Sequence, residues 1–332
     1  MSGWIELTCR SPVADPAPLL SAHLAPFLAA ERAAGGLTAA LLLRELGRPE
    51  RPRLTVQART GQAPRLADRW RRVTHDMGAT GVTTGPAREV PLAGSGFDGP
   101  GLAPLTRDFL AEVTPALLPV AGATDPAARL AMALDLAAAH LPAVAASVVP
   151  GPHGGAPLSF LSFRSHSEAF LASTRDPAAV RLTLERRYGT VRDHVVGRLA
   201  GIVAQVRGTG PEVSPSARSW FDAVRRAKPV MAEAFRTGGM SVADDDPPAS
   251  GGALARSAFH HTVGSSPDLR HFLAHDPGFL ATRLLTSLLY LALHTTGLPL
   301  VERYFLCHAL SRACEELFEV DADAVLGSLA GA

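Results

Sequence analysis

The stretch Phe279–Gly297, FLATRLLTSLLYLALHTTG, predicts an almost wholly apolar helix with one narrow polar stripe. Arg283, Ser287, Tyr290 and His294 recur at helical spacing, and at about 100° per residue they fall within an arc of roughly 60°. The other positions are mostly Leu and Ala, which we expect to be buried. A solvated face would normally carry Lys and Glu, whereas this stripe carries a hydroxyl, a phenol and an imidazole. Such a stripe can face water or line a polar pocket inside the protein.

The bulk composition describes a globular chain without a strong charge of either sign. The 332 residues are 47% hydrophobic and 19% charged, which fits one large domain or two ordinary ones and excludes a disordered chain. Lys228 is the only lysine, so Arg supplies almost all positive charge, and the formal net charge is +1. We therefore expect neither nucleic acid nor an anionic membrane as a partner.

Three cysteines, Cys9, Cys307 and Cys314, form no CxxC pair, and we expect free buried thiols in a reducing compartment. The first ten residues, MSGWIELTCR, have neither the basic start nor the long apolar run of a signal peptide. Arg283 and Tyr290 interrupt the longest apolar helix, and the run between them is too short to cross a bilayer. These features predict a cytoplasmic protein without a membrane span.

The periodicity of the chain changes near residue 102, from short strands to repeated helices. We predict an α+β fold, in which a small N-terminal sheet with helices is fused to a mostly helical body. The strand-rich part is 1–101, the helix-rich part is 102–332, and together they are expected to form one domain. The polar, Pro- and Gly-rich stretch 240–252 is predicted to be a loop, and is a candidate lid or linker.

The expected elements follow from hydrophobic spacing and from Gly and Pro punctuation. The N-terminal part is predicted to hold strands at 4–9, 37–46 and 53–59, helices at 15–32 and 61–76, and short strands with turns over 79–101. The helical body is predicted to hold helices at 103–118, 125–147, 165–174, 176–207, 214–236, 252–274, 279–296, 299–318 and 321–329.

Cofactor and metal motifs are weak throughout the chain. GSGFDGPG (94–101) is the nearest approach to a phosphate-binding glycine loop, but it lacks the strand-to-helix context. His271 and His275 form an HxxxH pair without the Glu of a zinc-protease helix and without an evident third ligand. No GxSxG elbow is present. We therefore predict no cofactor and no metal.

Two other segments carry candidate binding residues. Ser165 and Glu168 have the S-x-x-E spacing of a capping box, which would put His166 in the first turn of a helix, where backbone N–H groups can meet an anionic ligand. Arg187 and His194, seven residues apart, would share a helix face, and a solvated face explains them equally well.

The two strand-end arginines, Arg44 and Arg53, flank the Arg-, Gly- and Pro-rich segment RELGRPERP. An Arg in this position can pair with a carboxylate of a bound peptide, although a solvated hairpin tip is the more common case.

The order of several segments resembles one protein family. WIELT (4–8), followed by a helix, LLLRE (41–45) and PRLTVQA (52–58), is similar to the opening of the C-terminal elimination domain of lantibiotic dehydratases. SFLSFRSHSEAFL (159–171) and the ERRYG segment also look like family segments. SLLYLALH (287–294) resembles the family's SLxHM helix, with Glu302 as the acidic residue that follows. The resemblance covers nearly the whole chain.

The departures from the family pattern concern its chemistry. Tyr290 stands where the eliminases keep the histidine of SLxHM, and Thr190 replaces the second Gly of RYGG. The Asn-Arg pair that follows in the family falls near His294 and Thr295 and is lost. Arg44 keeps the arginine of the FIRY-like strand without its aromatic neighbours. A chain that keeps the scaffold and loses this histidine looks like a thiopeptide pyridine synthase.

That resemblance implies a cofactor-free, formal aza-[4+2] cycloaddition of two dehydroalanines in a ribosomally made precursor peptide, with loss of water and the leader. It implies catalytic roles for Tyr290, Ser287, His194 and Tyr188. It implies substrate-binding roles for Arg44, Arg53, His166, Arg187, Arg283 and His294. A glutamate eliminase of the same family and a non-catalytic peptide-binding scaffold are the alternatives. The oligomeric state stays open.

Overall fold

The computed structural model describes residues 4–45, 52–90, 96–145, 147–242 and 256–331. These residues fall into two compact units. The first unit is Met1–Ala93, Gly101–Ala133 and Leu288–Pro299, and the second is Gly94–Pro100, Leu134–Ser287 and Leu300–Ala332. A single domain over 1–332 stays a prediction. The predicted loop 240–252 lies almost wholly outside the described residues, as do most of RELGRPERP and the first residues of GSGFDGPG.

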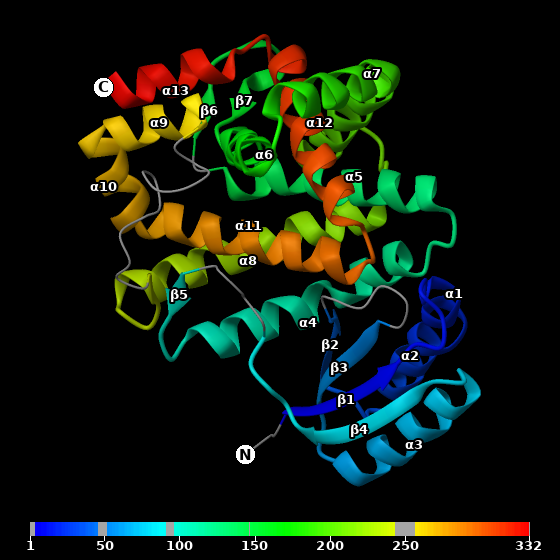
Figure 1. The fold of residues 1–332 in the computed structure, drawn as a ribbon. Helices are drawn as coiled ribbons and strands as arrows, with labels where there is room; N and C mark the ends of the chain where they lie inside the picture. The colour runs from blue at the N-terminus through cyan, green and yellow to red at the C-terminus, as the bar shows by residue number, and fades with distance from the viewer. Residues whose placement is uncertain (1–3, 46–51, 91–95, 146, 243–255, 332) are drawn as a thin grey trace. The chain divides into compact units, whose positions relative to one another are not determined.

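The first unit is built on a four-stranded antiparallel sheet with the strand order β2-β3-β1-β4 (Figure 1). Its elements in chain order are β1 (Trp4–Arg10), α1 (Ala17–Leu19), a π-helical turn (Leu20–Leu24), α2 (Ala25–Ala33), β2 (Ala39–Arg44), β3 (Arg53–Arg59), α3 (Ala63–Asp76), β4 (Thr80–Pro86) and α4 (Leu102–Ala121). Because β3 lies between β1 and β2, the topology is a split βαβ arrangement. The sequence patterns located these strands but did not predict their order.

Both faces of the sheet are covered. Strand residues such as Leu7 and Val56 pack on one face against α1–α2 and α3, where Trp70 is fully buried. On the other face α4 lies against β2, and the Leu42 N–H donates to the Thr114 hydroxyl at 3.3 Å. Double coverage explains why Gln57, on the face of β3 opposite to that of Val56, is also buried.

The second unit is helical with two small strand pairs. Its long elements are the end of α5 (Pro126–Val144), α6 (Phe160–Ser173), α7 (Pro177–Arg207), α8 (Pro215–Arg236), α9 (Ala258–Ser265), α10 (Pro267–His275), α11 (Pro277–Thr295, up to Ser287), α12 (Leu300–Phe318) and α13 (Ala322–Gly331). The strand pairs are β5 (Phe97–Asp98) with β8 (Ser241–Val242), and β6 (Val148–Val149) with β7 (Ala156–Pro157). The predicted fold class, a small N-terminal sheet followed by a mostly helical body, is confirmed.

Helix starts in the second unit follow a simple local rule. Asp176, Ser214 and Ser266 each accept a backbone N–H at the N-cap, and each is followed by Pro in the first turn. The helix predicted over 252–274 is therefore wrong as one element, because the Ser266 cap and Pro267 divide it into α9 and α10.

The capping box predicted for Ser165 and Glu168 is also wrong. Helix α6 begins at Phe160, so both residues lie inside it, and His166 is not in the first turn. The buried aromatic side chains of Phe160 and Phe163 extend the helix upstream of the point where polar spacing suggested a start.

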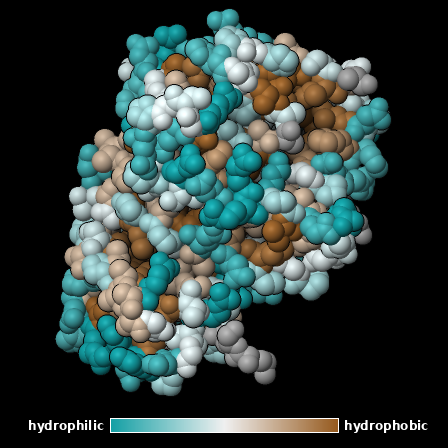
Figure 2. All heavy atoms as spheres, turned by 180° about the vertical axis from the view of Figure 1, so that it is seen from behind, coloured by the Kyte–Doolittle hydropathy of each residue, from teal (hydrophilic) through white to brown (hydrophobic). Residues whose placement is uncertain are grey.

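One described helix, α5, is long and apolar enough to cross a membrane, but 67% of its apolar window is buried inside the protein. It also carries Asp135, which is buried and paired with Arg198, and the buried His140. These polar contacts identify α5 as a core helix. On the face shown in Figure 2, hydrophobic residues lie in patches among hydrophilic ones. The three cysteines are buried and free, as predicted.

Candidate active site

The polar stripe on α11 is half-buried along its whole length. Leu284, Leu285, Leu288 and Leu289 are fully buried, whereas Arg283, Ser287, Tyr290 and His294 all have intermediate exposure. The Ser287 hydroxyl donates to the Arg283 carbonyl at 3.1 Å, so its oxygen keeps acceptor capacity for another partner. The stripe is neither an ordinary solvated face nor sealed core.

Buried polar contacts fix the rotational orientation of helix α11 within the second unit. The Thr286 hydroxyl lies 3.2 Å from Nε2 of His140, and the Trp220 indole N–H donates to Nδ1 of the same ring at 3.3 Å. Since Nδ1 accepts, Nε2 carries the proton and donates to Thr286. Burial lowers the pKa of His140 to about 3, so the ring stays neutral. One imidazole thus links α5, α8 and α11, and it fixes the direction in which the Ser287 face of α11 points within the second unit.

The Arg283 end of the stripe meets a histidine of α6. The Arg283 guanidinium lies over the Phe97 ring at 5.3 Å, and burial lowers its pKa. Nδ1 of His166 lies 2.7 Å from the Ser162 carbonyl, so Nδ1 donates and Nε2 is the acceptor of the neutral ring. Burial lowers the pKa of His166 below 6.5, the hydrogen bond to Ser162 raises it, and Coulombic repulsion from Arg283, and from His260 when that ring is protonated, lowers it. His166 and Arg283, two predicted substrate-binding residues that are 117 positions apart in the sequence, are thereby brought near each other.

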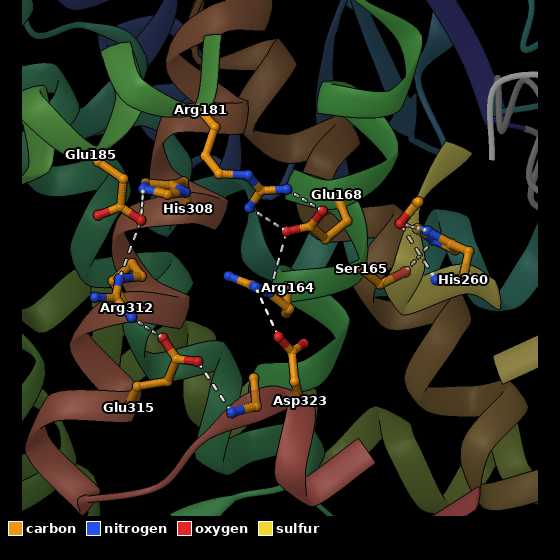
Figure 3. A network of polar contacts seen from close by, with 12 residues as sticks. Arg164, Ser165, Glu168, Arg181, Glu185, His260, His308, Arg312, Glu315 and Asp323 are labelled. Carbon is orange, nitrogen blue, oxygen red and sulfur yellow. Dashed lines mark hydrogen bonds and ion pairs between the residues drawn. The ribbon is translucent and has the colours of Figure 1, made fainter. Parts of the chain in front are cut away.

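A second imidazole, His260, lies beside His166 and was not selected from the sequence. Its Nε2 is 3.1 Å from the Ser165 hydroxyl, and its Nδ1 is 2.9 Å from the Ser257 hydroxyl (Figure 3). Burial lowers its pKa below 6.5, while Glu168 acts in the opposite direction. Ser165 and His260 are 95 residues apart, and no local motif marks the pair.

Glu168 itself belongs to an ion-pair network. It accepts two hydrogen bonds of 2.7 Å from the Arg181 guanidinium, and Arg164 lies 3.3 Å away. These cations keep the pKa of the Glu168 carboxyl low against the effect of its burial. Figure 3 shows the Ser165–His260 pair next to this carboxylate. The carboxylate is therefore occupied by arginines and does not act as the direct partner of His260.

In the first unit, the structure joins two other predicted substrate-binding residues. Nε2 of His294 lies 3.0 Å from the Arg44 carbonyl, and the ring N–H donates to it. Gly297 has φ of +85°, and a Cβ there would come within 2.3 Å of the Arg44 guanidinium. Burial and the nearby Arg129 lower the pKa of Arg44, whereas Asp15 raises it. Arg53 donates to the Thr8 hydroxyl at 3.3 Å.

The described contacts do not join Arg187, Tyr188 or His194 to the stripe. The Arg187 guanidinium forms two hydrogen bonds to Glu302, at 3.0 and 2.6 Å, and lies 3.8 Å over the Phe305 ring. Tyr188 is 3% exposed, and burial together with the charge of Glu316 raises its pKa. His194 is exposed on α7 and does not share the half-buried position of Arg187. Their predicted roles stay predictions.

No group of three potential metal ligands occurs within the described ranges. The predicted HxxxH pair does exist on α10, with the rings of His271 and His275 4.5 Å apart. This pair has no further His, Cys, Asp or Glu positioned to complete a metal site in the described part of the chain.

The fold is shared with solved structures, although no family model and no curated protein matches the chain. TsrL aligns with a TM-score of 0.77 and 24% identity over 99% of both chains. TbtD, a pyridine synthase from thiomuracin biosynthesis, aligns with a TM-score of 0.64 and 20% identity over 96% of this chain and 100% of its own. The predicted resemblance to a pyridine synthase is therefore confirmed at the level of the fold.

A partial likeness to a larger protein accompanies these two. The tRNA-dependent lantibiotic dehydratase MibB from Microbispora sp. 107891 aligns over 94% of this chain and 28% of its own, with 17% identity. Its TM-score of 0.48 is too low to support an argument about function or fold.

Proposed function

We propose that the chain is a cofactor-free pyridine synthase that acts on a ribosomally made precursor peptide with a leader and a modified core. The reaction is a formal [4+2] cycloaddition of two dehydroalanines, followed by loss of water and of the leader as its amide. The half-buried polar stripe on α11, with Ser287 and Tyr290, is the observation that carries this proposal. The fold shared with the pyridine synthase TbtD supports it.

The chemistry requires proton partners on both sides of one amide. The amide of one dehydroalanine must lose its N–H proton and gain a proton on oxygen to become the imidic acid of a 2-azadiene. The Tyr290 phenol can donate to the amide oxygen, and the Ser287 oxygen can accept the amide N–H because its own proton is directed to Arg283. Ser287 and Tyr290 are three positions apart on one helix face, which suits a single amide group.

Most of the remaining activation free energy of the cycloaddition arises from bringing the two distant alkenes together. Orientation of this kind is worth up to about 7–11 kcal/mol in favourable cases. His166, Arg283 and His294 offer polar groups along the stripe that can hold peptide amides. Arg44 and Arg53 are proposed to bind the peptide as well. Three residues of α7 are proposed to contribute less to binding and catalysis than the stripe residues: Arg187, which is paired with Glu302, Tyr188 and His194.

The two alternatives make different predictions for the same protein. A glutamate eliminase of the related family would use a histidine where this chain has Tyr290, which argues against elimination. A non-catalytic scaffold would bind precursor peptide along the stripe without converting it.

Two peptides incubated in parallel with the purified chain separate these functions. We expect the dehydrated, azole-bearing linear precursor to lose the mass of leader amide plus water and to gain a pyridine chromophore. Loss of glutamate from a glutamylated peptide, without a pyridine product, would establish the eliminase instead. Tight binding of every peptide without a change of mass would establish the scaffold and contradict the proposal.

A further inference from the structure

We propose that His260, held between the hydroxyls of Ser257 and Ser165, exchanges protons with the substrate through Ser165, and that Ser257 is the residue that positions its ring. This inference rests on the proposed function and adds to it a proton-transfer group that the resemblance did not indicate. His260 is half-buried at the start of α9, and Ser165 lies inside α6.

The contacts of His260 suit a ring that changes its protonation state. Each ring nitrogen faces a hydroxyl, at 3.1 Å for Nε2 and 2.9 Å for Nδ1. A hydroxyl can donate or accept, so the two serines accommodate either neutral tautomer and also the imidazolium. A carboxylate on one nitrogen would instead fix one tautomer and favour the charged ring.

The Ser257 side chain is itself fixed in place. It is the N-cap of α9 and accepts the backbone N–H of His260 at 3.4 Å, in addition to its contact with the ring. Ser257 is only 4% exposed. The ring is thus attached at one end to a buried hydroxyl that cannot move without loss of the helix cap, while its other end reaches Ser165 on a neighbouring helix.

Burial favours a neutral His260 ring at pH 7, against the effect of a nearby carboxylate. Burial is the main influence, and it lowers the pKa. The negative charge nearest to it, Glu168 on α6, raises the pKa, but this carboxylate is paired with Arg181 of α7 and Arg164 of α6. Asp323 on α13, a helix that packs against α9, pairs with Arg164 as well. A ring that is neutral and held by hydroxyls is ready to accept a proton.

His260 is connected to the stripe through residues of the second unit. Ser165 and His166 are consecutive on α6, and the charges of His260 and Arg283 both act on His166. Arg283 is one turn of α11 from Ser287, whose hydroxyl donates to its carbonyl. The Ser165–His260 pair therefore lies in the part of the second unit that also holds His166 and Arg283, one turn of α11 from Ser287.

The proposed proton path is balanced at each elimination. The Ser165 oxygen takes one proton from the cycloadduct as its own hydroxyl proton passes to Nε2 of His260, which becomes an imidazolium. The imidazolium then returns a proton through Ser165 to the departing hydroxyl, which leaves as water. The same cycle delivers a proton to the departing leader amide nitrogen. After each elimination His260 is neutral again, so no oxidant, reductant or added base is consumed.

The test is turnover and peptide affinity of His260→Asn, with His261→Asn as the matched control. Asn keeps a hydrogen-bonding group beside the serines but neither takes up nor releases a proton near neutral pH, so we expect turnover to fall about 100-fold with the Kd for the precursor within about twofold. His261 is the exposed neighbour on the same helix, and its variant should match the wild type. Ser165→Ala is the second variant, with a fall of about 10-fold expected if proton relay through its hydroxyl is lost.

A measurement that does not depend on turnover accompanies these variants. The ring nitrogen resonances of His260 should titrate with a midpoint below pH 6.5, and the midpoint should shift in Ser165→Ala. Full turnover in His260→Asn, in a preparation where Tyr290→Phe is inactive, would overturn the role of His260 and leave the proposed function standing. A wild-type chain that binds the precursor and never forms a pyridine would overturn both.

Discussion

Two polar regions of the helical unit lie near each other in Figure 3 and are built on opposite principles. Between α7 and α12, Glu185 lies 3.4 Å from Arg312 and 3.5 Å from the buried His308, and Arg312 also binds Glu315 at 2.6 Å. Around α6, α9 and α11 the groups are mainly hydroxyls and neutral imidazoles. We call the first region the ion-pair ladder; it is formed by Glu185, His308, Arg312 and Glu315 together with the Arg187–Glu302 and Arg192–Glu316 pairs. We call the second region, formed by Ser165, His166, His260 and Ser287 beside the Arg283 guanidinium, the neutral cluster.

The contrast separates a structural region from a candidate site. In the ion-pair ladder each charge is matched by an opposite charge, as in the Arg187–Glu302 and Arg192–Glu316 pairs, so the groups are occupied in holding helices together. In the neutral cluster the hydroxyls retain acceptor or donor capacity and the rings can take up protons. Breaking a closed pair should change stability, whereas altering the neutral cluster should change turnover.

The largest expected effect is that of Tyr290→Phe. Loss of the phenol hydroxyl would remove the proposed donor to the amide oxygen, so turnover should fall by about 100-fold or more, while fold and precursor Kd are kept. Single-turnover mass spectrometry measures the rate. Tyr304→Phe is the matched control, because Tyr304 is also half-buried and its ring stacks on Phe170 at 4.2 Å. Equal loss in both variants would contradict a specific role for Tyr290.

The ion-pair ladder should make the free energy of unfolding depend on pH. Burial, and then the positive charges of Arg164, Arg312 and Arg181, lower the pKa of His308 to about 4. The unfolded chain takes up this proton near pH 6.5 and the folded chain only near 4, so stability falls as the pH decreases through that window. The contribution of His308 is about 2 kcal/mol between pH 7 and pH 5.

Urea denaturation of His308→Gln measures that contribution. The loss of unfolding free energy between pH 7 and pH 5 should be smaller in this variant than in the wild type. His261→Gln, which replaces an exposed histidine, should keep the wild-type dependence. If His308→Gln and the wild type showed the same pH dependence of stability, the folded protein would protonate His308 as readily as the unfolded chain does, and the lowered pKa of His308 would be contradicted.

Ser287→Ala should have a smaller effect on turnover than Tyr290→Phe. The hydroxyl is assigned to orient the amide, and one lost hydrogen bond of about 1.4 kcal/mol corresponds to about 10-fold in rate. Ser173→Ala is a matched control, since Ser173 is exposed and its hydroxyl also bonds a carbonyl of its own helix. A rise in precursor Kd without a change in turnover would reassign Ser287 to binding alone.

The smallest expected effect distinguishes the two predicted roles of Arg187. As a member of the ion-pair ladder, Arg187→Ala should lower the free energy of unfolding by about 1 kcal/mol, since the Glu302 pair is partly exposed. Arg186→Ala, at an exposed neighbour, should not. Unchanged stability with a raised precursor Kd would instead support the substrate-binding role predicted from the sequence. Thermal and urea denaturation, with peptide titration, measure both quantities.

Local features were predictable from the sequence where local physics determines them. Helices such as α7 and α8 start at a polar cap followed by Pro, so their predicted bounds are within a residue or two of those observed. The polar stripe on α11 follows from periodicity, whereas its half-burial is known only from the structure. The start of α6 was missed because the burial of Phe160 and Phe163 depends on tertiary packing that spacing does not contain.

Contacts between distant segments were not predictable. Ser165 meets His260 across 95 positions, and Arg187 meets Glu302 across 115. Nothing in either segment distinguishes an arginine that will be paired from one that will face a ligand, so Arg187 and Arg283 looked equivalent in the sequence. The order of the strands in the split βαβ sheet likewise depends on pairing that no single strand specifies.

The most direct test of the central claim is carbon–carbon bond formation by the wild-type chain. A linear precursor with carbon-13 at the β-carbons of both dehydroalanines is incubated with the protein, and the product is followed by NMR. We predict one-bond coupling between the two labelled carbons in an aromatic ring, together with release of the leader amide. Two uncoupled alkene signals that persist while the peptide is fully bound would contradict the account.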